Sequence, residues 1–158
     1  MIAMQILGLL LLLIGYADME LGFYIEPPPD FILGSYSDTA GATWLSPDGK
    51  SELRLVVMPL ESDQDKKKLL DSLVDTSSLE SKDKSYLTTQ ALAETNAEAG
   101  MWTDIAAGVG SGRIRGRMYM LAGKKSLIVA IATCPLSSWE STESLFMSSL
   151  RSMKFLEK

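Results

Sequence analysis

Hydrophobic and polar residues follow two clear patterns in the stretch 113–133. In its first half, three arginines alternate with small or apolar residues, the period of two expected for a strand with one wet and one dry face. Its second half, 127–132, is apolar at every position, which is typical of a strand covered on both faces. We therefore predict an antiparallel hairpin whose second strand is central in its sheet. The three alternating arginines are Arg113, Arg115 and Arg117.

A second hairpin is predicted around the turn Pro47-Asp48-Gly49-Lys50, between strands at 42–46 and 51–58. Proline presets φ at the first turn position, and glycine accepts a positive φ. Trp44 in the first strand has two interpretations. It is either a ligand platform or an aromatic ring half-buried against an aliphatic partner across the hairpin, and the second is the commoner arrangement. One face of the second strand carries Leu53, Leu55 and Val57.

The chain before this hairpin predicts one short strand and a loop. Residues 21–26 form the strand, which the proline run 27–29 ends because three missing amide donors cannot sit inside a ladder. We expect residues 31–33 to pack against the core. Residues 34–41 are rich in Gly, Ser, Asp and Thr and indicate a loop.

Two helices are predicted, each with a capping box at its start. Ser62 precedes a helix at about 63–76, with Asp65 three residues later in place of the usual Glu, and Ser137 and Glu140 begin a closing helix. Lys66, Lys67 and Lys68 suit an anionic ligand, but a solvated helix face explains them more simply. The closing helix carries an apolar stripe that should pack on the central hairpin. Its members are Trp139, Phe146, Leu150 and Met153, with Leu145 beside them.

The region between the helices gives weaker signals. Residues 86–95 suit either a strand or a helix, 96–100 suit a turn, and 101–109 suit a strand. Glycines at 108, 110 and 112 stand just before the first arginine, as in a loop that cradles phosphate. Their spacing fails the dinucleotide fingerprint, and no helix opens at them, so a flexible hairpin loop is the better interpretation.

The N-terminus predicts export. Residues 6–14 are almost entirely Leu and Ile, too short a run for a membrane-spanning helix of ~20 residues but suited to the apolar core of a signal peptide. Gly15 and Ala17 fit cleavage before Asp18, so residues 1–17 are the predicted signal and 18–158 a single domain. The first five residues lack Lys and Arg, which departs from the pattern. If uncleaved, the run is a buried element of the domain, or a segment that associates transiently with membranes.

Composition excludes several kinds of chemistry. The net charge of −5 argues against a nucleic-acid partner, since such proteins carry a basic surface. The chain has no histidine and one cysteine, Cys134, which excludes Cys/His zinc sites, Ser-His-Asp or Cys-His catalysis and an internal disulfide. Without a histidine to activate it, Cys134 is best interpreted as a small buried apolar residue.

The order of elements predicts an α+β domain in which helices cover an antiparallel β-sheet. The segment 23–27, Phe-Tyr-Ile-Glu-Pro, followed by Phe31, resembles the opening of PsbP-like domains. The ending, 145–155, is similar to the closing helix and tail of the same superfamily. Its members include PsbP of photosystem II, a Ran-binding import factor and DcrB-type bacterial envelope proteins. The resemblance implies an α/β/α sandwich with a non-enzymatic accessory or binding role, and it carries over no catalytic residues and no cofactor.

These observations favour an exported domain, periplasmic or secreted, that binds a protein partner in a bacterial envelope. A cytoplasmic or membrane-associated location is the alternative. The alternative function is a module that binds a small molecule, an anion or a metal, at Asp38 and Asp48 or at the arginines. A hydrolase using carboxylates alone is the third hypothesis, and no pair of acidic residues is spaced to favour it.

A working surface is predicted on the face of Arg113, Arg115 and Arg117, because three like charges two residues apart repel mildly and contribute little to stability. Pairing with acidic residues on a neighbouring strand is the more common explanation of such a face. Trp44 and Trp102 are second candidates, as exposed aromatic residues.

Overall fold

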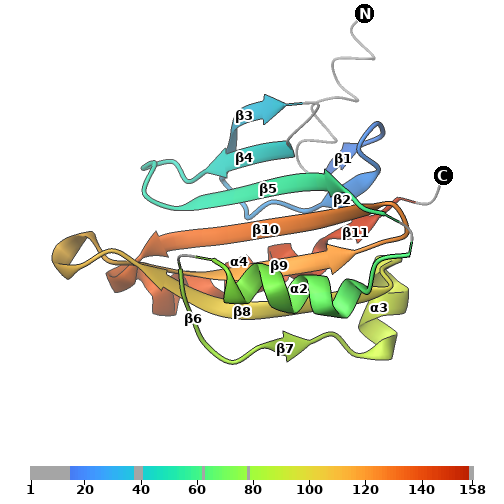
Figure 1. Ribbon diagram of the computed structural model, residues 1–158. Coiled ribbons are helices and arrows are strands. Elements are labelled where there is room, and N and C mark those ends of the chain that lie inside the picture. The colour runs from blue at the N-terminus through green and yellow to red at the C-terminus, as the bar shows by residue number, and fades with distance from the viewer. Residues whose placement is uncertain (1–14, 38–40, 62, 78, 157–158) are drawn as a thin grey trace, which may run out of the picture.

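The computed structural model describes residues 15–37, 41–61, 63–77 and 79–156. Its centre is an eight-stranded antiparallel sheet, shown in Figure 1. In spatial order the strands are β3 (Ile32–Ser37), β4 (Gly41–Leu45), β5 (Glu52–Pro59), β10 (Ser126–Pro135), β9 (Ile114–Ala122), β8 (Ala99–Ala107) and β6 (Glu80–Ser81), and β7 (Ser85–Tyr86) also pairs with β8. The predicted hairpin 113–133 is confirmed as β9 and β10, and β10 lies between β5 and β9 as expected of a fully apolar strand.

The predicted wet face of β9 is wrong. Beyond Gly116, every residue of this strand is buried. The side that carries Arg117 continues with Tyr119 and Leu121, and the other side carries Met118 and Met120. Strand β9 is therefore covered on both faces. Its alternating arginines have the pattern of a strand with one solvent-exposed face, so the sequence does not indicate this burial.

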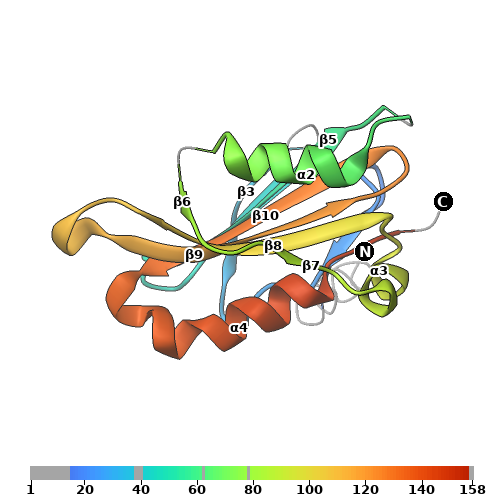
Figure 2. The ribbon, with the colours of Figure 1, turned by 60° about the horizontal axis from the view of Figure 1, so that its bottom comes forward.

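Helices cover the two faces of the sheet. Figure 2 shows α2 (Lys66–Asp75) on one side and α4 (Trp139–Ser152) on the other. Leu70 and Val74 of α2 belong to one buried cluster, and the stripe of α4 belongs to the second. The predicted α/β/α sandwich is thus confirmed. Leu145 departs from the expected stripe, since 44% of its surface is exposed.

The helix starts differ from the predicted capping boxes. The N-cap of α2 is Asp65, whose carboxylate accepts a hydrogen bond from the Lys68 amide at 3.1 Å, and Ser62 lies outside the described residues. A 3₁₀ turn over Leu136–Ser138 precedes α4, so the Ser137 and Glu140 box does not form. Residues 86–95, which suited either a strand or a helix, mainly form helix α3 (Thr89–Thr95). This helix ends at Asn96, whose backbone lies in the left-handed region.

The hairpin of β4 and β5 is confirmed, with Trp44 opposite Leu53. The loop predicted at 34–41 is wrong at 34–37, which belong to β3, and at Gly41, which belongs to β4, while residues 38–40 lie outside the described residues. Glycine and serine favour a loop, yet pairing with the outer edge of β4 satisfies one side of this backbone. The ladder shifts register between Leu33 and Ser35, so Gly34 lies at a bulge.

A three-stranded sheet lies beside α4 and consists of β1 (Tyr16–Asp18), β2 (Phe23–Ile25) and β11 (Lys154–Phe155). It confirms the short strand predicted at 21–26, and β11 pairs the tail of the chain with β2. The apolar run 6–14 lies outside the described residues. Strand β1 spans the predicted cleavage site before Asp18, and cleavage there remains a prediction. Within the described part of the chain, no helix is long and apolar enough to cross a membrane.

The close approach of β9 to β10 generates a stability prediction. A Cβ at Gly116 would overlap the carbonyl oxygen of Ala132, which is backbone and cannot turn aside. We expect Gly116→Ala to lower the free energy of unfolding by about 1–3 kcal/mol, measured by urea denaturation. Gly112→Ala is the matched control, because nothing lies within 4 Å of a Cβ there. Equal stability of the two variants would contradict this account of the strand pair.

Candidate functional site

The predicted arginine face includes a buried ion-pair cluster around Arg117, the last of its three arginines. Only 5% of Arg117 is exposed. Its Nε donates to Asp104 Oδ1 at 2.7 Å, and its Nη2 lies 2.9 Å from Glu143 Oε1. Asp104 is the residue directly opposite Arg117 on β8, and Glu143 lies on α4. One guanidinium therefore joins two strands to the helix that covers them.

Two tryptophan rings flank this guanidinium. The central guanidinium carbon of Arg117 lies 4.3 Å from the centroid of Trp102 and 5.7 Å from that of Trp139. The same carbon of Arg115 lies 5.0 Å from Trp139. A cation over an aromatic face is attracted by the ring quadrupole, and the attraction grows where water is excluded. Trp102 is thus a half-buried partner of Arg117 rather than an exposed ring.

The two other arginines lie nearer the surface and are also paired. Arg113 Nη2 lies 2.8 Å from Glu80 Oε2 on β6, and Arg115 Nη2 lies 3.8 Å from Asp104 Oδ2. Pairing with acidic residues on neighbouring strands, the favoured explanation, is therefore what the structure shows. A hollow of about 190 Å³ lies between these side chains and Lys82.

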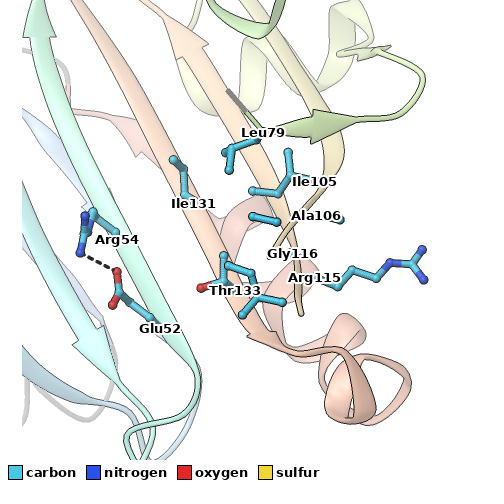
Figure 3. Close-up of a pocket in the computed structure, with 11 residues that line it drawn as sticks. Glu52, Arg54, Leu79, Ile105, Ala106, Arg115, Gly116, Ile131 and Thr133 are labelled. Carbon is cyan, nitrogen blue, oxygen red and sulfur yellow. Dashed lines mark ion pairs between the residues drawn. The ribbon is translucent and has the colours of Figure 1, made fainter. Parts of the chain in front are cut away.

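A second hollow, of about 300 Å³, opens on the α2 side of the sheet (Figure 3). Aliphatic side chains from several strands form most of it, among them Ile105 and Ile131, and the ion pair of Glu52 with Arg54 borders it at 3.0 Å. The Arg115 side chain extends away from the other labelled residues. This hollow gathers no set of nucleophilic or acid–base groups.

A third concavity, larger than these two hollows, is a groove of about 650 Å³ between β3, the proline run and α4. We call it the β3 groove. Two apolar residues that line it are exposed, Ile32 by 67% and Leu145 by 44%. The sequence does not indicate this groove. Phe31 and Leu33 pack against the core as expected, whereas Ile32 is exposed. Further lining residues are Pro28, Leu33, Trp44, Ser148 and Ser149.

Long-range contacts hold the walls of the β3 groove in place. The Glu26 amide donates to Ser152 Oγ at 2.7 Å, and Ser149 Oγ donates to the Glu26 carbonyl at 2.5 Å. The ring of Phe31 meets Phe146 edge-on at 6.1 Å. Helix α4 therefore fixes the segment that leads into β3. This wall does not depend on Gly15 and Tyr16, which also line the groove and which the predicted cleavage would remove.

Trp44 packs beneath the β3 groove and is not the exposed aromatic residue that was predicted. Only 2% of its surface is exposed, and its ring meets Tyr16 edge-on at 5.2 Å. Its position opposite Leu53 agrees with the favoured interpretation of an aromatic residue packed across the hairpin.

The structure explains two other singled-out residues by local roles. Asp48 Oδ1 accepts hydrogen bonds from Ser46 Oγ at 2.6 Å and from the Lys50 amide at 3.0 Å, so it stabilises the turn. Asp38 lies outside the described residues.

Cys134 is fully buried on the α4 side, and burial raises the pKa of its thiol. Among the described residues, no three His, Cys, Asp or Glu side chains form a metal-binding group.

Comparison with known proteins identifies the fold. No protein-family model and no curated protein sequence matches the chain. Among solved structures, cyanobacterial PsbP (CyanoP) from Synechocystis sp. PCC 6803 is similar, with a TM-score of 0.61 and 12% identity over 89% of this chain and 91% of that one. LpqN of Mycobacterium tuberculosis, described as involved in cell envelope biogenesis, has a TM-score of 0.66 and 10% identity over 90% of each chain.

A mutant of Mog1 is a third similar structure, with a TM-score of 0.56 and 11% identity over 91% of this chain and 96% of that one. The chain therefore has a PsbP-like fold, as the resemblance at its two ends implied. At 10–12% identity these likenesses concern the fold alone.

The buried cluster generates a prediction for Arg117. Arg117→Met keeps much of the side chain's bulk but leaves Asp104 and Glu143 without their shared cation. We expect the free energy of unfolding to fall by about 3 kcal/mol, the lower end for a broken buried pair because Glu143 is close to solvent. Arg113→Met is the control and should cost less than about 1 kcal/mol. Urea denaturation measures both, and equal losses would show that burial does not distinguish the two arginines.

A pH dependence follows from Cys134 and Tyr119. Burial raises the pKa of the thiol above its ordinary 9.0 and that of the phenol above its ordinary 10.0. The folded state then holds these protons more tightly than the unfolded state, so their contribution to stability is present below pH 9 and is lost as the pH rises beyond it. Urea midpoints from pH 7 to 11 should fall above pH 9, less steeply in Cys134→Ala. A flat profile to pH 11 would contradict this prediction.

Proposed function

We propose that the protein is an exported accessory domain of a bacterial envelope, and that it binds a protein partner at the β3 groove without catalysing a reaction. The observation that carries the proposal is the pair of exposed apolar side chains, Ile32 and Leu145, at a groove whose walls are fixed by the fold. Exposed apolar surface around a concavity marks interaction sites more often than it marks ordinary surface.

Export is supported by the apolar run 6–14 with small residues before Asp18. The likeness to CyanoP and to LpqN, a protein involved in cell envelope biogenesis, agrees with an accessory role in an envelope. Neither resemblance names a partner for this chain, so the groove itself has to define what can bind.

The alternative function, anion binding, has its best location in the hollow beside Arg113, Arg115 and Lys82. It has weaker support than the β3 groove, because Glu80 and Asp104 already occupy the two guanidinium groups. An added anion would have to displace or share these carboxylates, which oppose it by charge.

Fractionation of the native host tests the proposal. We expect the protein in the envelope or secreted fraction, with an intact mass that starts at Asp18, and as part of a complex larger than the 17.3 kDa chain on native size separation. Ile32→Lys should release it from this complex, because a charge at the groove opposes apolar contact.

Val109→Lys is the matched control, since Val109 is 87% exposed in the β8–β9 connection, outside the groove. It should leave the complex intact. Full-length protein found only in the cytosol, with no larger species, would overturn the proposed function.

A further inference from the structure

We propose that the occupant of the β3 groove is an extended segment of the partner protein, which adds a strand to the free edge of β3 and carries Lys or Arg next to its apolar residues. The inference rests on the proposed function and names the chemistry of the partner. It is carried by three features of the described residues: an unpaired strand edge, an apolar floor, and two exposed carboxylates that form no ion pair with a described residue.

The first feature is the backbone of β3. Within the described residues this six-residue strand pairs on one side only, with β4. The opposite edge of the sheet is blunted, because β6 and β7 have two residues each. Proteins protect exposed edges with charges or proline, yet the sequence Ile-Leu-Gly-Ser-Tyr-Ser has neither. Its bulge at Gly34 is the one protective device present. Free amides and carbonyls of such an edge accept a further strand.

The second feature is the floor beside this edge. Leu33 lies opposite Trp44 in the ladder, so the two residues share the face that looks toward α4. Leu145 of α4 and Pro28 border the same space. Alternate side chains of an added strand would point to this face, and apolar ones would bury the surface that Leu33 and Leu145 now expose to water.

The third feature selects among possible occupants. Glu26 and Asp30 are the charged residues among the described ones that line the groove, and both are exposed. A second copy of the chain that docks β3 against β3 would bring the same two carboxylates and no cation from its groove to meet them. Residues 1–14 contain no charged side chain. A partner segment that carries Lys or Arg complements these carboxylates, so the charges favour it over both other occupants.

Two synthetic peptides test the inference on the full chain. One is Lys-Thr-Val-Thr-Val-Thr-Lys, whose lysines and valines share one face of an extended strand, and the other replaces both lysines with glutamates. We expect the lysine peptide to bind more tightly, and at saturation to slow hydrogen exchange of amides within 32–37 at least tenfold. Protection of the strand amides distinguishes strand addition from simple filling of the groove.

Variants separate the apolar contribution from the charge contribution. Ile32→Lys should abolish binding of the lysine peptide, and Val109→Lys should not. Glu26→Gln combined with Asp30→Asn should weaken binding of that peptide about two- to five-fold for each carboxylate removed, and should not weaken binding of the glutamate peptide. Asparagine suits position 30 because it tolerates the positive φ of 69° found there.

The inference is overturned if neither peptide binds, if both bind equally, or if binding leaves the exchange of β3 amides unchanged. Sedimentation of the free protein tests whether a second copy of the chain occupies the groove. A dimer that Ile32→Lys dissociates would assign the groove to self-association and would also overturn the inference. All of these results are compatible with the complex that is expected in the native host. The absence of that complex would refute the proposed function instead.

Discussion

The buried guanidinium of Arg117 is the interaction on which the placement of α4 depends. Removing a charge from water costs several kcal/mol, and two carboxylates and two tryptophan rings offset this cost only when β8, β9 and α4 are all in register. An apolar stripe alone tolerates sliding along a sheet, whereas a directed ion pair does not. We infer that Arg117 fixes the position of α4 more than it adds to stability.

The position of α4 in turn defines the β3 groove. The same helix that holds Glu143 against Arg117 presents Ser149 and Ser152 to the backbone of Glu26 about two turns later. Those contacts position the proline run and Phe31, and so the entry into β3. An edge strand and an apolar floor thus lie side by side because a helix from the far end of the sequence joins them, which links the buried cluster to the proposed binding site.

Local patterns in the sequence predicted the two hairpins and the apolar stripe of α4, because each rests on a period that neighbouring residues share. The burial of Arg117 was missed because its partners, Asp104 and Glu143, are distant in sequence, and an alternating arginine strand has the same pattern whether wet or buried. Strand β3 was missed because its glycine and serines have low strand propensity, and only the edge of β4 makes them a strand. The β3 groove could not be predicted for both reasons, since its walls come from four segments that are separate in the sequence.

Photo-crosslinking in the native host tests the central claim, that a partner segment docks along β3. A photoreactive amino acid at position 32 should give one adduct, and mass spectrometry should place it on a segment of another protein with alternating apolar residues and a nearby Lys or Arg. The same group at position 109 should not form this adduct. Crosslinks from position 32 to a second copy of the chain, to residues 1–14, or to a partner's helix would contradict the account.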